Sequence, residues 1–206
     1  MSMRNGLSAV MLAAACVGGA QAANIALTFD TDAQGITATG GTLVHEAGGY
    51  LAQTDIDSAN MSLYLPASLL GNWSQYLGGT LSFDAINLSG VASDWGDFGQ
   101  VTLTGSAGQV TVDLAPGTEP GATWQTYATT LDAATWGANL GDVLADVTSV
   151  SIVLESHNGF GPGNSEINGF DNFKVSAAAV PEPSTWALLA TGLALMGCVH
   201  RRRSRH

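Results

Sequence analysis

The stretch QVTLTGSAGQVTVDL, residues 100–114, decides the fold class of this chain. Apolar Val101 and Leu103 alternate with polar residues up to a Gly-Ser-Ala-Gly segment, and the alternation resumes at Val110. A period of two residues places apolar side chains on one face of a strand, and a short glycine-rich interruption predicts a turn. These residues therefore predict an antiparallel hairpin with one buried face and one solvated face.

The same alternation recurs on both sides of the hairpin. GTLSFDAINL, residues 79–88, places Leu81 and Phe83 on one face, and TSVSIVLES, residues 148–156, does the same with Ile152. Short alternating runs separated by frequent turn residues are typical of two packed antiparallel sheets. The expected fold class is all-β, an antiparallel β-sandwich of the jelly-roll type.

Helical patterns are few. Residues 66–70 predict one turn, and LDAATWGANLGDVLADV, residues 131–147, is the strongest helical segment, with Asp132 as its N-cap. Gly137 and Gly141 weaken that segment, so we expect one or two short helices at an end of the sandwich.

The amino terminus predicts an export signal. Arg4 supplies a positive charge, residues 7–17 form a short apolar run, and Ala20-Gln21-Ala22 offers small residues at the positions that a signal peptidase reads. We therefore expect a signal peptide with a helical apolar part over residues 1–22. A lipid-modified Cys16 and a permanent transmembrane helix are the alternatives.

The remaining chain divides into a sandwich domain over residues 23–176, a linker over residues 177–179 and a terminal segment over residues 180–206. Residues 23–179 contain sixteen acidic residues and a single base, Lys174. Such an acidic surface repels nucleic acid and attracts cations, so we expect no nucleic-acid partner. Both cysteines lie outside this span, which excludes disulfides and thiolate metal sites within it.

The carboxyl terminus reads VPEPSTWALLATGLALMGCVHRRRSRH. Pro181, Glu182 and Pro183 precede an apolar run at residues 186–199, and an arginine cluster follows at residues 201–205. The apolar run is short for a helix that spans a membrane, and the arginines favour the cytoplasmic side. On physical grounds the segment is therefore either a hydrophobic anchor helix or a removable signal.

This order of motif, apolar run and basic tail resembles the PEP-CTERM sorting signal of exported bacterial proteins. The resemblance implies an exosortase as processing partner, with cleavage near Pro181, Glu182 and Pro183. It also implies export across the inner membrane, with transient contact of that membrane through a C-terminal hydrophobic helix. The mature protein would then reside at the cell surface or in the extracellular matrix of a biofilm.

Three aspartates suggest a calcium site. FDTDAQG, residues 29–35, begins like an EF-hand loop through Asp30 and Asp32, but Gly41 occupies the position of the required glutamate. Asp171 shares the parity of Phe173 in a predicted strand, so a regular strand turns its carboxylate inward. An inward carboxylate requires a partner, either a hard cation or backbone N–H groups, and both alternatives stay open.

Four segments resemble the laminin IV type A (laminin B) module, which is related to galactose-binding jelly rolls. They are LTFDTDAQGI, YLGGTLSFDAI, TWQTYATTLD and the pair VTSVSIVLESHNG and EINGFDNFKV, spread over residues 25–176. Many jelly rolls of this wider group hold a structural Ca²⁺ between their first and last strands. The resemblance thus implies a site that combines Asp30 or Asp32 with Asp171.

Aromatic residues offer a second candidate site. Binding sites for sugars combine flat aromatic faces with carboxylates or amides that bond hydroxyl groups. Trp95 stands between Asp94 and Asp97 in SDWGDFG, so these three residues form our predicted carbohydrate-binding site. Trp124 and Trp136 adjoin predicted elements, and we expect both in the core.

The sequence offers little for catalysis. A glycosidase requires two carboxylates, and Glu155 and Glu166 supply the best available pair on either side of a glycine-rich loop. The leading hypothesis is a non-enzymatic, calcium-stabilised surface protein that binds polysaccharide. A secreted glycan-active hydrolase and a purely structural matrix protein without ligand are the alternatives.

Overall fold

The computed structural model describes residues 24–178 and 191–192. The predicted signal peptide, the sorting motif Pro181-Glu182-Pro183 and nearly all of the C-terminal apolar run lie outside the described residues. Within the described part of the chain, no helix is long and apolar enough to cross a membrane.

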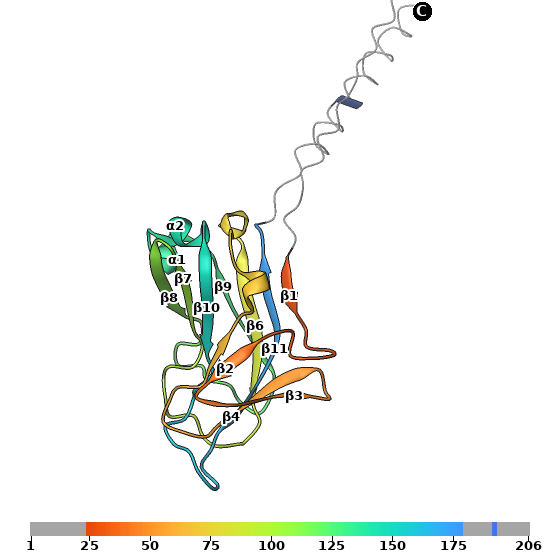
Figure 1. Cartoon of the computed structure of the whole chain (residues 1–206), viewed down its shortest axis with the longest axis vertical. Helices are drawn as coiled ribbons and strands as arrows, with labels where there is room; N and C mark the ends of the chain where they lie inside the picture. The colour runs from red at the N-terminus through yellow and green to blue at the C-terminus, as the bar shows by residue number, and fades with distance from the viewer. Residues whose placement is uncertain (1–23, 179–190, 193–206) are drawn as a thin grey trace, which may run out of the picture. The chain divides into compact units, whose positions relative to one another are not determined.

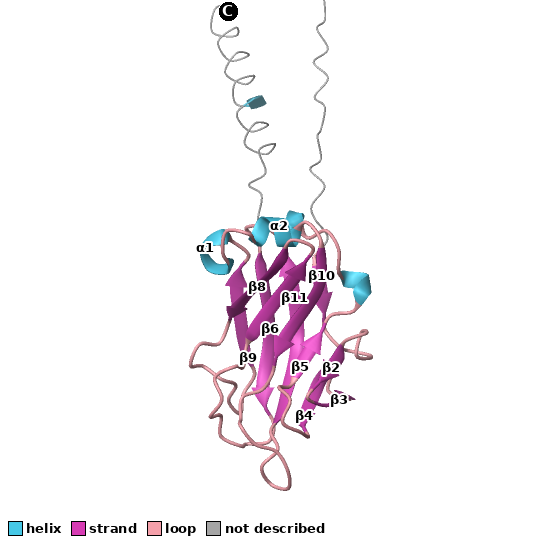
Figure 2. Ribbon diagram, turned by 60° about the vertical axis from the view of Figure 1, so that its left-hand side comes forward, coloured by secondary structure: helices cyan, strands magenta, loops and turns pink. Residues whose placement is uncertain are grey.

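Residues 24–178 fold into two antiparallel sheets that pack face to face (Figures 1 and 2). The first sheet has the order β3-β4-β11-β6-β9, with β1 paired to β11. Its strands are β1 (Ile25–Leu27), β3 (Gly41–Glu46), β4 (Tyr50–Asp55), β6 (Thr80–Asn87), β9 (Gln125–Thr130) and β11 (Ile167–Ser176). The second sheet has the order β2-β5-β10-β7-β8. Its strands are β2 (Thr37–Thr39), β5 (Ser62–Tyr64), β7 (Gln100–Gly105), β8 (Gly108–Asp113) and β10 (Val147–Val153). The predicted all-β sandwich is confirmed.

The opening hairpin is formed by β7 and β8, with Val101 opposite Val112 and Leu103 opposite Val110. Its apolar positions face the other sheet because the chain alternates in and out of the core. The helices also agree with the prediction. They are η1 (Ala67–Leu69), η2 (Ser74–Tyr76), α1 (Ala133–Trp136) and α2 (Leu140–Leu144), and α1 and α2 lie at one end of the sandwich (Figure 2).

Asp132 caps α1 by accepting a hydrogen bond of 2.8 Å from the backbone N–H of Thr135. Gly137 ends this helix in a left-handed conformation with φ of 97°, which a residue with a side chain adopts only under strain. The predicted helical segment is therefore broken into two short helices at its glycine.

Aromatic rings fill the space between the sheets. Phe83 lies at the centre, with ring centroids 5.3 Å from Phe170 and 5.5 Å from Tyr127. Phe98 and Phe173 extend the cluster, and all five side chains are buried. Rings at these separations bury a large apolar area, which anchors the first sheet against the second.

A bulge in β11 overturns the prediction that Asp171 points inward. The pairing of β11 with β6 shifts between Asp171 and Lys174, and Asn172 adopts φ of 51°. An extra residue in one strand reverses the faces of the residues that follow it. Asp171 therefore lies on the outer face, between buried Phe170 and the bulge, although Phe173 points inward.

Candidate functional site

The outer face of the first sheet carries an exposed aromatic pair. Trp124 directly precedes β9, and 42% of its surface is exposed. Its ring centroid lies 5.4 Å from that of Tyr50 on β4, at an interplanar angle of 74°. The prediction of a core position is thus wrong for Trp124, whereas Trp136 is buried as predicted, with 4% exposure.

The indole of Trp124 rests over a glycine. Gly169 on β11 lies between Ala52 of β4 and Ile86 of β6. A Cβ atom at Gly169 would lie 2.6 Å from Cγ2 of Ile86 and 3.1 Å from Cη2 of Trp124. The missing side chain therefore lets the indole lie close to the sheet, where the indole contacts the ring of Tyr50.

Two carboxylates accompany the aromatic pair on the same face. Asp171 of β11 lies opposite Asp84 of β6, two residues along each strand from Gly169 and Ile86. The side-chain amide of Asn172 donates to both carboxylates, at 2.9 Å to Asp84 and 3.2 Å to Asp171.

Further contacts hold this carboxylate pair in place. Asp84 also accepts a bond of 2.6 Å from the hydroxyl of Thr126. Partial burial raises the pKa of Asp171, and the charges of Asp84 and Asp30 raise it further. The hydrogen bond from the backbone N–H of Asn172 lowers this pKa, but by less than burial raises it. The two carboxylates thus form a fixed set of hydrogen-bond acceptors beside the rings.

We name Tyr50, Asp84, Trp124, Gly169 and Asp171 the Trp124 face. Exposed apolar side chains extend it, since Val44 lies opposite Ala52 and Leu88 follows β6. An exposed ring beside oriented acceptors is the arrangement that stacks on a sugar ring and bonds its hydroxyl groups.

The predicted calcium ligands are only partly brought together. Asp30 lies near enough to Asp171 to affect its pKa, and its carboxylate accepts a bond of 2.6 Å from the hydroxyl of Thr28. Asp32 instead accepts the backbone N–H of Gln34 at 2.7 Å. Among the described residues, no group of three or more His, Cys, Asp and Glu is arranged to hold a metal ion. A calcium ion at these aspartates stays a prediction.

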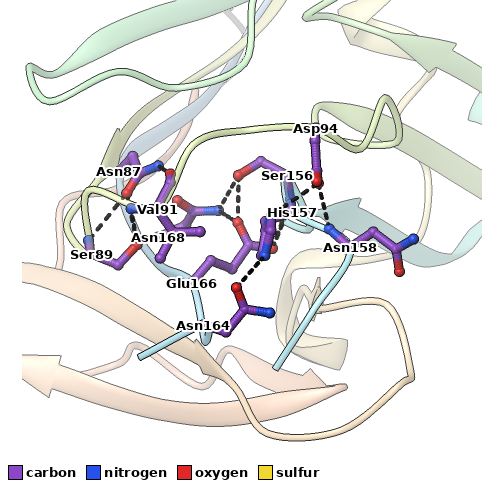
Figure 3. Close-up of polar contacts among 10 residues, drawn as sticks. All are labelled: Asn87, Ser89, Val91, Asp94, Ser156, His157, Asn158, Asn164, Glu166 and Asn168. Carbon is purple, nitrogen blue, oxygen red and sulfur yellow. Dashed lines mark hydrogen bonds and ion pairs between the residues drawn. The ribbon is translucent and has the colours of Figure 1, made fainter. Parts of the chain in front are cut away.

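The predicted carbohydrate site at Trp95 lies in the loop before β7. Asp94 accepts the backbone N–H of Asn158 at 2.7 Å and contacts the ring of His157 at 2.9 Å (Figure 3). The bond from Asn158 is the main cause that lowers the pKa of Asp94. Asp97 accepts a bond of 3.0 Å from Asn60.

Trp95 itself is partly buried, and its indole N–H is enclosed without an acceptor among the described residues. The carboxylates of Asp94 and Asp97 connect neighbouring loops through their bonds to Asn158 and Asn60. Sugar binding at Trp95 stays a prediction.

The two glutamates of the hydrolase alternative lie in the interior. Glu166 is fully buried and accepts bonds from the backbone N–H groups of Ser156 and His157, at 2.8 and 3.1 Å (Figure 3). The Ser156 hydroxyl and the Asn168 amide bond it as well. Glu155 is 7% exposed and accepts the backbone N–H of Met61 at 2.8 Å. A polysaccharide cannot reach carboxylates that are enclosed in this way, so the geometry gives no support to a hydrolase at this pair.

A family model for the PEP-CTERM protein-sorting motif matches residues 179–204. The match confirms the reading of the terminal segment and indicates an exported surface protein that an exosortase processes. No curated protein sequence matches the chain.

Solved structures share the fold of the sandwich. The L4b domain of human laminin alpha-2 superposes with a TM-score of 0.58 at 10% identity, over 77% of this chain and 98% of that domain. An agarase superposes with a TM-score of 0.50 at 14% identity, and the match spans 77% of this chain but only a quarter, 25%, of the agarase. A xylan-binding domain from CBM 22 gives a TM-score of 0.43 at 13% identity, over 76% of this chain and 96% of that chain. The predicted laminin-like jelly roll is thus confirmed as a fold.

Proposed function

We propose that this chain is an exported, non-enzymatic surface protein whose sandwich binds a neutral polysaccharide through the Trp124 face. The observation that carries the proposal is the indole of Trp124, which is exposed yet held against Tyr50 and over Gly169. A ring fixed before binding loses little conformational freedom when a sugar stacks on it. The fold does not choose the ligand, because a laminin domain and an agarase share it.

Charge favours a neutral ligand. Residues 23–179 contain sixteen acidic residues and one base, and the Trp124 face itself carries Asp84 and Asp171. Such a surface repels uronic acids and sulfated sugars, whereas carboxylates accept bonds from the hydroxyl groups of neutral sugars. Binding should therefore be stronger for glucans, xylan or agarose than for alginate.

The sorting motif supports a role outside the cell, where such polysaccharides are found. The burial of Glu155 and Glu166 gives no support to the hydrolase alternative at that pair. The calcium ion expected from the sequence belongs to this proposal as a stabiliser of the fold, not as a ligand of the sugar.

Affinity electrophoresis of the full chain tests the proposal. Gels that contain a neutral polysaccharide should retard the protein, and Trp124→Ala should abolish the retardation. Trp95→Ala compares the two candidate sites: it should leave the retardation unchanged, and loss of retardation in this variant alone would place binding in the loop before β7. A wild-type chain that no neutral polysaccharide retards, or Trp124→Ala with unchanged mobility, contradicts the proposal. Reducing ends released from the same polysaccharides report any hydrolase activity.

A further inference from the structure

The inner face of the first sheet changes from apolar to polar at the end opposite α1 and α2. Leu51 and Phe170 are buried inner-face neighbours, but the next inner positions along their strands are Gln53, Asp55 and Asn168, each fully buried. Gln53 lies directly opposite Asn168. Opposed residues of neighbouring strands have their Cβ atoms about 5 Å apart, so their side chains share one region of the interior.

Three oxygen atoms in this region have no hydrogen-bond partner among the described residues. They are Oε1 of Gln53, Oδ2 of Asp55 and Oδ1 of Asn168. Buried polar atoms are almost always bonded, and an unpartnered oxygen costs free energy unless a donor or a cation meets it.

The orientations of the two amides are fixed by their nitrogen atoms. Nε2 of Gln53 donates to the carbonyl of Thr39 at 2.8 Å, and Nδ2 of Asn168 donates to the carbonyl of Leu154 at 2.6 Å and to Glu166 at 2.8 Å. Rotating either amide would place its oxygen against another oxygen. The unpartnered oxygens are therefore a consequence of the fold, and Figure 3 shows Asn168 held in this way beside Glu166 and Ser156.

A second carboxylate belongs to the same region. Glu155 uses one oxygen for the backbone N–H of Met61, and the charges of Glu166 and Asp55 act on it. Glu166 is different, because four donors already surround its carboxylate.

No lysine or arginine is at hand to neutralise this region. Lys174 is the one lysine or arginine of residues 23–179, and it is exposed next to the bulge of β11. The ring of His157 contacts Asp94, and its charge also lowers the pKa of Asp55 and Glu155, but burial raises the pKa of both carboxyls by more.

We propose that these oxygens form a buried site for a hard divalent cation, best fitted to Ca²⁺. The carboxylates of Asp55 and Glu155 and the amide oxygens of Gln53 and Asn168 are its ligands. Calcium accepts carboxylate and amide oxygens in irregular arrangements, whereas Mg²⁺ requires a nearly ideal octahedron and retains water. Zinc prefers histidine and cysteine, which are not among these ligands. This site is distinct from Asp30, Asp32 and Asp171, the calcium ligands predicted from the sequence.

Such a cation joins the end of β4 to the segment that connects β10 with β11. Asp55 ends β4, Glu155 follows β10, and Asn168 is the second residue of β11. Glu155 follows a strand of the second sheet, whereas Asp55 and Asn168 belong to the first, so a bound cation would hold the two sheets together at this end.

Calcium titration of the full chain tests the site, after treatment with EDTA and removal of the chelator. Thermal melting and titration calorimetry with CaCl₂ should show that Ca²⁺ binds the wild type and raises its Tm. Asp55→Asn and Glu155→Gln should each weaken Ca²⁺ at least tenfold. Asp171→Asn should leave the affinity unchanged, which separates this site from the other aspartates. The same titration with MgCl₂ should raise Tm much less.

Glu155→Gln keeps an acceptor for Met61 and has nearly the same volume, so it tests the site even if Asp55→Asn does not fold. In the absence of calcium this variant should melt above the wild type, because it removes a buried charge. A wild-type chain whose Tm does not respond to Ca²⁺ overturns the proposal. A response that Asp171→Asn abolishes and Glu155→Gln retains overturns it as well, in favour of the predicted site at Asp171.

Discussion

Glu155 should make the metal-free protein less stable as the pH rises through neutrality. Burial, with additional repulsion from Glu166 and Asp55, raises its pKa from 4.5 to about 7. A carboxyl with a raised pKa binds its proton more tightly when folded, so stability is highest below pH 4.5 and falls until the pH exceeds 7. One pKa step corresponds to about 1.4 kcal/mol, so ionising Glu155 costs the folded domain about 3 kcal/mol.

The assay is thermal melting in EDTA at several pH values between 4 and 8, for the wild type and for Glu155→Gln. About 3 kcal/mol corresponds to roughly 6–12 °C in the Tm of a domain of this size. The difference between the variant and the wild type should be small at pH 4 and reach that magnitude at pH 8. Raised pKa values of Asp55 and Glu166 act in the same direction and remain in both proteins. A difference that does not change with pH would show that Glu155 ionises as freely in the fold as in water, and would refute the reasoning.

Other predictions follow from single contacts. Gly169→Ala should displace the indole of Trp124, because the added Cβ would lie 3.1 Å from Cη2 of that ring, so retardation in polysaccharide gels should weaken. Asp132→Ala removes the N-cap of α1 and should lower stability by about 1 kcal/mol in urea unfolding. Alanine at positions 181–183 should leave an unprocessed precursor on immunoblots of an exosortase-containing host, whereas a processed form would contradict the motif. Calorimetry should find that Ca²⁺ affinity rises from pH 5 to 7, since the cation displaces the proton of Glu155. An affinity that does not change with pH would show that Glu155 is not a ligand of the cation.

The sandwich could be predicted because its signals are local. Alternation in residues 100–114 determines which side chains of the hairpin are buried, and the glycines mark the turn. The broken helix could also be predicted, since Asp132 caps its start and Gly137 ends its first part through contacts within a few residues. Strand order was not predictable in this way, because pairs such as β11 with β6 join distant parts of the chain.

Two features of the Trp124 face were not predicted from the sequence. A single residue with positive φ, Asn172, reverses the face of Asp171 relative to Phe173, and no sequence pattern specified that bulge. Trp124 was misplaced for a simpler reason. It shares the parity of Thr126, on the outer face, while Tyr127 shares the parity of the core. Strand alternation carried through Trp124 would have placed it outside.

The alternation of the strands also predicts that one end of the core is polar, but only the structure shows which buried oxygens are left without a partner. Gln53 and Asp55 continue the parity of Leu51, and Asn168 shares the parity of Phe170, so a regular strand places all of them inside. A buried carboxylate that lacks enough hydrogen-bond donors requires a proton or a cation, and one oxygen of Asp55 has no partner among the described residues. Proton and cation would then compete for the same oxygens. In acid the proton stabilises this end of the sandwich, and outside a cell at neutral pH, where calcium is available, the cation would replace it.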